Sequence, residues 1–186
     1  MIYFLHQVYT DENTGKPYLC DANMLSKCPN IKYASEMFRA LLNMPECSIY
    51  MNMFAKQSEL EDCSSMFYSA RRLTGSITST LFNNSLGTLK NVQNLFAHTN
   101  MTSVESGFLY GNRKNTKLQY VGNIFYSCNN ITGNSPEFWN ADKFSNIEMS
   151  QKGYNGALFE CNNLTNYNTA NSISTNWTIN TALIDY

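Results

Sequence analysis

The stretch SSMFYSARRLTG at residues 64–75 returns in altered form as GNIFYSCNNITG at residues 122–133. Both copies contain Phe-Tyr-Ser, with Thr-Gly beginning five residues after the serine. The offset between the two copies is 58, which is twice 29. A repeat with a period of 29 therefore predicts the same pattern halfway between them.

Apolar residues follow this period along most of the chain. Aliphatic residues occur every 29 positions, at Ile2, Ile31, Leu60, Leu89, Leu118 and Ile147. Seven residues after the first five come Tyr9, Phe38, Phe67, Phe96 and Phe125. A third set of landmarks lies in mid-coil at Leu25, Phe54, Phe82, Tyr110 and Trp139. Periods of about 20–50 residues are typical of proteins in which each unit buries its apolar face against its neighbours.

The sixth aromatic landmark, Phe159, comes five residues late. The intervening sequence EMSQKGYNG, residues 148–156, is polar and contains glycine, so we expect a small surface insertion there.

Two kinds of segment make up each predicted coil. LTGSI at 73–77 and ITGNS at 131–135 indicate one short strand per coil. CSSMFYSA at 63–70 and VGNIFYSC at 121–128 have apolar residues at helical spacing, which favours a short helix. The sequence thus predicts an α/β repeat solenoid of about six 29-residue coils, each with one short parallel strand plus a short helix. It would occupy residues 1–165, and residues 166–186 would form a C-terminal cap or tail.

The phrase MFYSARRLTGSI at 66–77, with its recurring apolar-Phe pair, resembles the BspA-like leucine-rich repeats. Cys128 and Cys161 stand where that family has its cysteine, whereas Ala70 departs from the pattern. The resemblance implies a curved leucine-rich-repeat-like solenoid that binds proteins or surfaces and has no catalytic residues. The heavy use of Asn, Tyr and Phe also resembles repeats in structural proteins of gut bacteriophages.

Composition narrows the functional classes. The chain of 186 residues has a net charge of −1 and 15% charged residues, which argues against nucleic-acid binding.

No apolar stretch approaches the length of about 18 residues that a membrane-spanning helix needs, so we expect no membrane insertion. The first nine residues lack the cationic start of an export signal, so a complete chain would be a soluble protein made in the cytosol. Only two histidines occur, His6 and His98, and neither belongs to a nucleophile motif.

The six cysteines form no C-x-x-C pair, and we expect them to be buried thiols. A disulfide among Cys20, Cys28 and Cys47 is the alternative, and a metal site is disfavoured. Five N-x-[ST] sequons occur, at Asn83, Asn100, Asn130, Asn163 and Asn176, which is about the number that composition alone predicts. We therefore draw no conclusion from the sequons.

The function predicted from the sequence is a non-enzymatic protein-interaction or structural module without a cofactor. The favoured setting is a phage virion component or host-surface recognition protein, made in the host cytoplasm. A fragment of a bacterial cell-surface adhesin and a carbohydrate-active enzyme on a repeat scaffold are the alternatives. The predicted binding surface includes Tyr68 and Tyr126 after the Phe landmarks, with Arg71 and Arg72 beside the first. The other interpretation is that both tyrosines only pad the outside of the short helix.

The two ends of the repeat differ. The aliphatic series begins at Ile2, with Phe4 close by, and leaves no room for an N-terminal cap. We therefore expect Ile2 and Phe4 to mediate self-association or contact with a protein partner. At the other end, Trp177 and Ile179 would hold the tail against the final coil.

Overall fold

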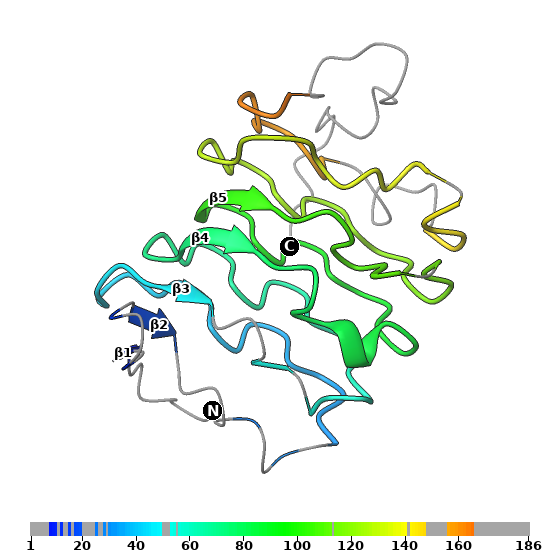
Figure 1. The fold of residues 1–186 in the computed structure, drawn as a ribbon, viewed down its shortest axis with the longest axis horizontal. Helices are drawn as coiled ribbons and strands as arrows, with labels where there is room; N and C mark the ends of the chain where they lie inside the picture. The colour runs from blue at the N-terminus through cyan, green and yellow to red at the C-terminus, as the bar shows by residue number, and fades with distance from the viewer. Residues whose placement is uncertain are drawn as a thin grey trace.

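A computed structural model describes residues 8–10, 12, 15, 17–19, 25, 28, 30–49, 53–54, 56–112, 114–140, 142–147 and 156–165. In that part the chain rises through coils that lie one above another, with the short strands at one side (Figure 1). Its regular elements are β1 (Val8–Thr10), β2 (Pro17–Leu19), β3 (Ser48–Ile49), β4 (Thr74–Ile77), η1 (Asn83–Ser85) and β5 (Asn100–Val104). Of these, η1 is a single turn of 3-10 helix.

The strands form two small sheets that share one side of the stack, which we call the strand side. β2 pairs with β3 in parallel, and β4 pairs with β5 in parallel. An isolated parallel bridge between Cys47 and Leu73 links the two sheets, and another from Ser103 to Thr132 continues the pairing beyond β5. The register between β4 and β5 shifts at Gly75/Ser76. Neighbouring coils therefore pair here over short and unequal lengths.

The predicted α/β class is wrong, because the described part of the chain contains no α-helix. The segments predicted as short helices are runs of tight turns. Ser65 and Ser69 have φ of 53° and 56°, and Asn123 and Ser127 have φ of 54° and 58°. An α-helix needs φ near about −60° at every residue, so two left-handed residues in each segment exclude one.

We call these segments the turn ribbon: residues 34–40, 63–69, 92–98 and 121–127, and 157–160 in the last described coil. Phe67 N donates to Leu95 O at 3.0 Å, and Ser69 N donates to Ala97 O at 2.8 Å. Tyr68, between them, instead closes a local turn by donating to Ser65 O at 3.1 Å. Alternate amides thus point along the stack, and the backbone satisfies its donors without a helix.

Stacked rings form the centre of the core. Phe38, Phe67, Phe96 and Phe125 lie one above another, with centroids 5.5, 5.3 and 5.9 Å apart and ring planes within 8° of parallel. The middle rungs of the aliphatic series, Leu60, Leu89 and Leu118, are fully buried. These burials confirm the periodic aliphatic series as interior in the three middle coils, whereas Ile31 and Ile147 are only partly buried against the core.

A second column of rings differs from the prediction in its upper coils. Phe54 stacks on Phe82 at 5.2 Å, and Phe82 contacts Phe108 at 6.4 Å. Phe108 and Phe138 are buried, whereas the predicted landmarks Tyr110 and Trp139 are only partly buried. The mid-coil segment varies in length, so the predicted landmark misses the buried residue by two positions at Tyr110 and by one at Trp139.

The last described coil corrects the position of Phe159. Ser127 N donates to Phe159 O at 2.9 Å, as His98 N donates to Tyr126 O one coil earlier. Phe159 therefore takes the place equivalent to Tyr126, and the fully buried Leu158 takes the core place. The insertion is four residues long, not five. Residues 148–155 of the predicted surface loop lie outside the described residues.

The N-terminal end of the strand side is a hairpin. β1 pairs antiparallel with β2, with Tyr9 opposite Tyr18. Tyr9 thus belongs to a hairpin strand, although its spacing predicted a place in the aromatic series. Ile2 and Phe4, predicted to mediate self-association, lie outside the described residues, as do Trp177 and Ile179.

The expectation of buried thiols is confirmed for four cysteines. Cys47, Cys63, Cys128 and Cys161 are buried and free, whereas Cys28 is free but exposed. The Cys128 and Cys161 thiols each donate, at 2.9 Å, to the carbonyl of a Phe one coil below. Burial raises the pKa of Cys128 to about 11, so this thiol is protonated and unreactive at neutral pH. Cys20 lies outside the described residues.

Candidate interaction surface

Tyr68 and Tyr126 lie on the outer face of the turn ribbon, where both are partly exposed. His98 lies between them. Its ring meets Tyr68 edge-on at 5.4 Å and 82°, and meets Tyr126 at 5.0 Å and 70°. The structure thus brings the two predicted tyrosines into one continuous column through a residue from the coil between them.

The column continues at both ends. Phe159 stacks on Tyr126 with centroids 5.2 Å apart and an interplanar angle of 18°. The Arg39 guanidinium lies 4.9 Å from the centroid of the Tyr68 ring, within the range of a cation–π contact. We call this column the aromatic stripe: Arg39, Tyr68, His98, Tyr126 and Phe159.

The repeat explains how the stripe is built. Arg39, Tyr68, Ala97 and Tyr126 follow one another at the same period of 29 along the sequence. Ala97 is fully buried, and its methyl group is too short to reach between the two tyrosines. The next residue, His98, has φ of 58°, and its imidazole fills the space that the alanine leaves.

The charge of His98 depends on its surroundings. Partial burial, and the nearby Arg71 guanidinium, lower the pKa of His98, and Glu160 opposes them with a smaller effect. The imidazole is therefore neutral at neutral pH. The centre of the stripe is then uncharged and aromatic, with Arg39 at one end and Arg71 beside it.

The two predicted arginines have different surroundings. Both are exposed. Arg72 Nε donates to Met44 O at 2.9 Å and so ties its coil to the one below. Arg71 is close enough to His98 to influence its pKa. Arg71 therefore lies beside the stripe, whereas Arg72 has a structural contact.

Sequence reasoning missed Arg39, His98 and Phe159 as surface residues. Arg39 stands one period before Tyr68, so the period could have revealed it. With an insertion of four residues instead of five, the period would have placed Phe159 at the surface position equivalent to Tyr126. The period does not predict His98 in the stripe. The residue at the periodic position is Ala97, and His98 enters the stripe from the next position in the sequence.

The acidic stretch at residues 59–62 stabilises the stack. The Lys90 ammonium lies 2.7 Å from the Glu61 carboxylate one coil below, and this contact lowers the pKa of Glu61. Asn91 Nδ2 donates to Asp62 Oδ2 at 3.0 Å. These carboxylates are therefore paired between coils.

Neither a metal-binding cluster nor a membrane-spanning helix occurs among the described residues. Within the described coils no three His, Cys, Asp or Glu residues are grouped so that they could hold a metal ion. The same residues include no helix with the length and apolar character that crossing a membrane requires. No family model matches the sequence, and no curated protein or solved structure matches it significantly.

Proposed function

We propose that this chain is a non-enzymatic interaction module that binds a protein partner along the aromatic stripe. The observation that carries the proposal is the unbroken contact from Arg39 through His98 to Phe159, across successive coils. Tyr, Trp and Arg are the residues that most often dominate binding energy at protein interfaces. A structural column would not need to leave these side chains partly exposed.

The rigidity of the ribbon supports this role. Each side chain of the stripe is attached to backbone that is hydrogen-bonded to a neighbouring coil or to its own turn. The backbone that carries the stripe therefore has little conformational entropy left to lose on binding. Arg39 is already paired with Glu36 in its own turn, so the exposed Arg71 is the cation that favours a partner with an apolar contact region and carboxylates at its edge.

The setting we propose is a phage virion, on the strength of the resemblance to phage structural repeats. The chain should then copurify with assembled particles and remain bound after salt washes. Recovery with the bacterial envelope, and not with particles, would contradict this setting and favour the adhesin.

Site-directed photo-cross-linking in the native host tests the stripe itself. A photoreactive phenylalanine at Tyr126 should give one reproducible cross-linked protein. The same group at the exposed Lys117, outside the stripe, is the matched control and should not capture that protein. Replacing Tyr68 and Tyr126 together by Ala should abolish copurification of the cross-linked protein. Equal cross-linking at both positions, or full binding by the double variant, would refute the stripe as the binding site.

A further inference from the structure

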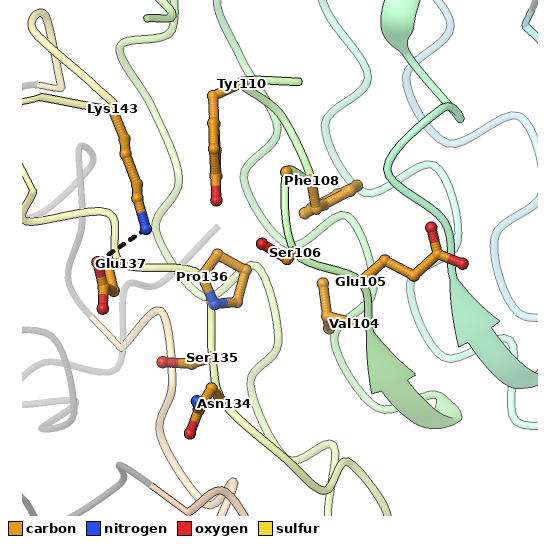
Figure 2. A pocket seen from close by; sticks show the side chains of 11 residues that line it. Val104, Glu105, Ser106, Phe108, Tyr110, Asn134, Ser135, Pro136, Glu137 and Lys143 are labelled. Atoms are coloured by element: carbon orange, nitrogen blue, oxygen red, sulfur yellow. Dashed lines mark hydrogen bonds and ion pairs between the residues drawn. The ribbon is translucent and has the colours of Figure 1, made fainter. Parts of the chain in front are cut away.

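A pocket of about 210 Å³ opens between two loops of successive coils, well separated in sequence. One loop follows β5, and the other includes residues 134–137 with Lys143. The lining residues are Val104, Glu105, Ser106, Gly107, Phe108, Tyr110, Asn134, Ser135, Pro136, Glu137 and Lys143. Figure 2 shows the Tyr110 hydroxyl pointing into the space between Lys143, Pro136 and Ser106.

The walls combine apolar surface with uncharged hydrogen-bonding groups. The apolar part comes from the partly exposed Val104 and from the edges of Phe108 and Pro136, both of which are otherwise buried. Hydroxyl and amide groups come from Tyr110 and Asn134, among others. Such a mixture holds a ligand by its apolar surface and orients it through a few polar groups.

Tyr110 is held in position by its neighbours. Burial alone would raise the pKa of its hydroxyl, but hydrogen bonds from Ser106 and Gly107 and the nearby Lys143 ammonium lower it overall. The ring is also fixed by an edge contact with Phe144 at 5.6 Å, and Lys143 Nζ lies 5.2 Å from its centroid. The hydroxyl is thus preorganised toward the pocket.

Two of the three charged lining groups, Lys143 and Glu137, neutralise each other. Lys143 Nζ lies 2.9 Å from Glu137 Oε2, which also accepts a hydrogen bond from Asn140 at 3.0 Å. Glu105 points away from this pair (Figure 2) and accepts hydrogen bonds from the Ser79 amide and hydroxyl at 3.0 and 3.2 Å. A charged ligand would have to compete with these contacts, so the pocket favours a neutral one.

Size narrows the ligand further. Pockets for drug-sized ligands occupy about 300–1,000 Å³. A volume of about 210 Å³ is smaller, so the pocket encloses about one small ring, and any larger ligand would extend outside it. A single pyranose ring is compact and neutral, with hydroxyls at its rim and C–H groups on its faces, which matches both kinds of wall.

We propose that this pocket binds one neutral pyranose, either free or as the terminal unit of a glycan. The site is separate from the aromatic stripe and does not depend on partner binding there. The apolar walls would contact the ring face, while Tyr110 and Asn134 would hydrogen-bond its hydroxyls.

Saturation-transfer NMR on the full chain tests the proposal. The probes are methyl glycosides of glucose, galactose, mannose and N-acetylglucosamine at millimolar concentrations. At least one should give a saturable signal, and glucuronic acid and glucosamine should bind at least tenfold more weakly. No saturable binding by any neutral glycoside, or tighter binding of a charged sugar, would overturn the proposal.

Variants assign the binding to the pocket. Tyr110→Phe keeps the ring and removes one hydroxyl, so it should weaken binding about tenfold. Asn134→Ala removes an exposed amide and should also weaken binding, without disturbing the fold. Tyr126→Phe, on the stripe, is the matched control and should bind normally. Unchanged affinity in both pocket variants would overturn the assignment.

A last comparison distinguishes a glycan end from a free sugar as the natural ligand. An oligosaccharide that ends in the preferred unit should bind at least as well as the methyl glycoside if the natural ligand is a glycan. Binding of the free sugar alone would identify a small-molecule ligand. Either result can be obtained whether or not the stripe binds a protein.

Discussion

The turn ribbon and the strand side both connect neighbouring coils through backbone hydrogen bonds, but they keep register differently. On the ribbon, Glu36, Ser65 and Asn94 each donate to a carbonyl of the next coil, always at a sequence offset of 28. On the strand side, the paired positions are 26 apart at Cys47 and Leu73 and 29 apart at Ser103 and Thr132. The ribbon offset is constant up to residues 121–127 and rises to 32 only at the last described coil, where the four-residue insertion precedes residues 157–160. The strand-side offset already varies among the earlier coils.

This difference shows where the period of the sequence originates. The ribbon carries the Phe series, and a slip of one residue there would turn a buried ring outward. The strand side tolerates the shift at Gly75/Ser76, because a bulge inserts one residue without moving the rest of the coil. We infer that the ribbon determines the spacing of the coils and that the strand side accommodates variation in length.

The largest expected effect comes from breaking the ribbon core. Phe96→Ala removes a buried ring that touches Phe67, Phe108 and Phe125, so we expect the free energy of unfolding to fall by about 3–5 kcal/mol. Phe159→Ala, on the partly exposed stripe, is the control and should cost much less. Denaturant unfolding measures both, and similar losses would contradict the assignment of core and surface.

The aliphatic series should come next. Leu89 and Leu118 are fully buried, so replacing either by Ala should lower the free energy of unfolding by about 2–5 kcal/mol. Chemical denaturation of the single variants checks this. Losses under about 0.5 kcal/mol at both positions would show that the series does not form the core.

A substitution on the strand side examines the bulge. Gly75 has φ of 87°, and an added Cβ would lie 2.9 Å from Ser48 Oγ. Gly75→Ala should therefore cost about 1–3 kcal/mol of unfolding free energy. Gly87→Ala is the matched control, since Gly87 has no left-handed φ and no atom near an added Cβ. If both variants unfold at the same temperature, the bulge is not a constraint.

The smallest effect concerns pH. The folded pKa of His98 lies below the ordinary value of 6.5, so between these values the unfolded chain binds a proton that the folded chain does not. The contribution of His98 to the free energy of unfolding is therefore complete above about pH 6.5. It is lost as the pH falls through the pKa of His98 in the folded state. His98→Asn, which suits the left-handed φ, should flatten the stability profile between about pH 7 and 5. If the free energy of unfolding of His98→Asn depends on pH as steeply as that of the unaltered protein, His98 is not the cause of the pH dependence.

The sequence predicted the buried column far better than the secondary structure. Leu60, Leu89 and Leu118 are buried as their spacing indicates. The prediction of a helix was wrong because the spacing of apolar residues carries no information on φ. Ser65 and Ser69 adopt left-handed φ values although neither is glycine or asparagine. Asn94 and Asn123 at the equivalent place were the available hint, since asparagine tolerates that region.

The candidate surface was predictable in part. The period placed Tyr68 and Tyr126 on one face, but the contact through His98 depends on the left-handed backbone that the sequence does not announce. The pocket was not predictable, because its loops leave the period. No sequence spacing relates Tyr110 to Lys143.

Three of the sequons turn out to mark a structural position. Asn100 Nδ2 donates to Arg71 O at 2.7 Å, and Asn163 Nδ2 donates to Asn129 O at 2.6 Å, each one coil below. Asn130 Nδ2 reaches Asn100 Oδ1 at 3.4 Å. These asparagines recur because an amide at this corner links successive coils, so counting sequons against composition overlooked their shared place.

The ribbon hydrogen bonds also determine how the chain would respond to force. They run along the stack, so pulling the two ends apart loads them in tension, one coil after another, instead of shearing many at once. Each released coil frees one full repeat, which extends to about 100 Å of chain. The molecule should therefore lengthen under load in repeated steps of that size and act as an extensible tether between whatever holds its two ends.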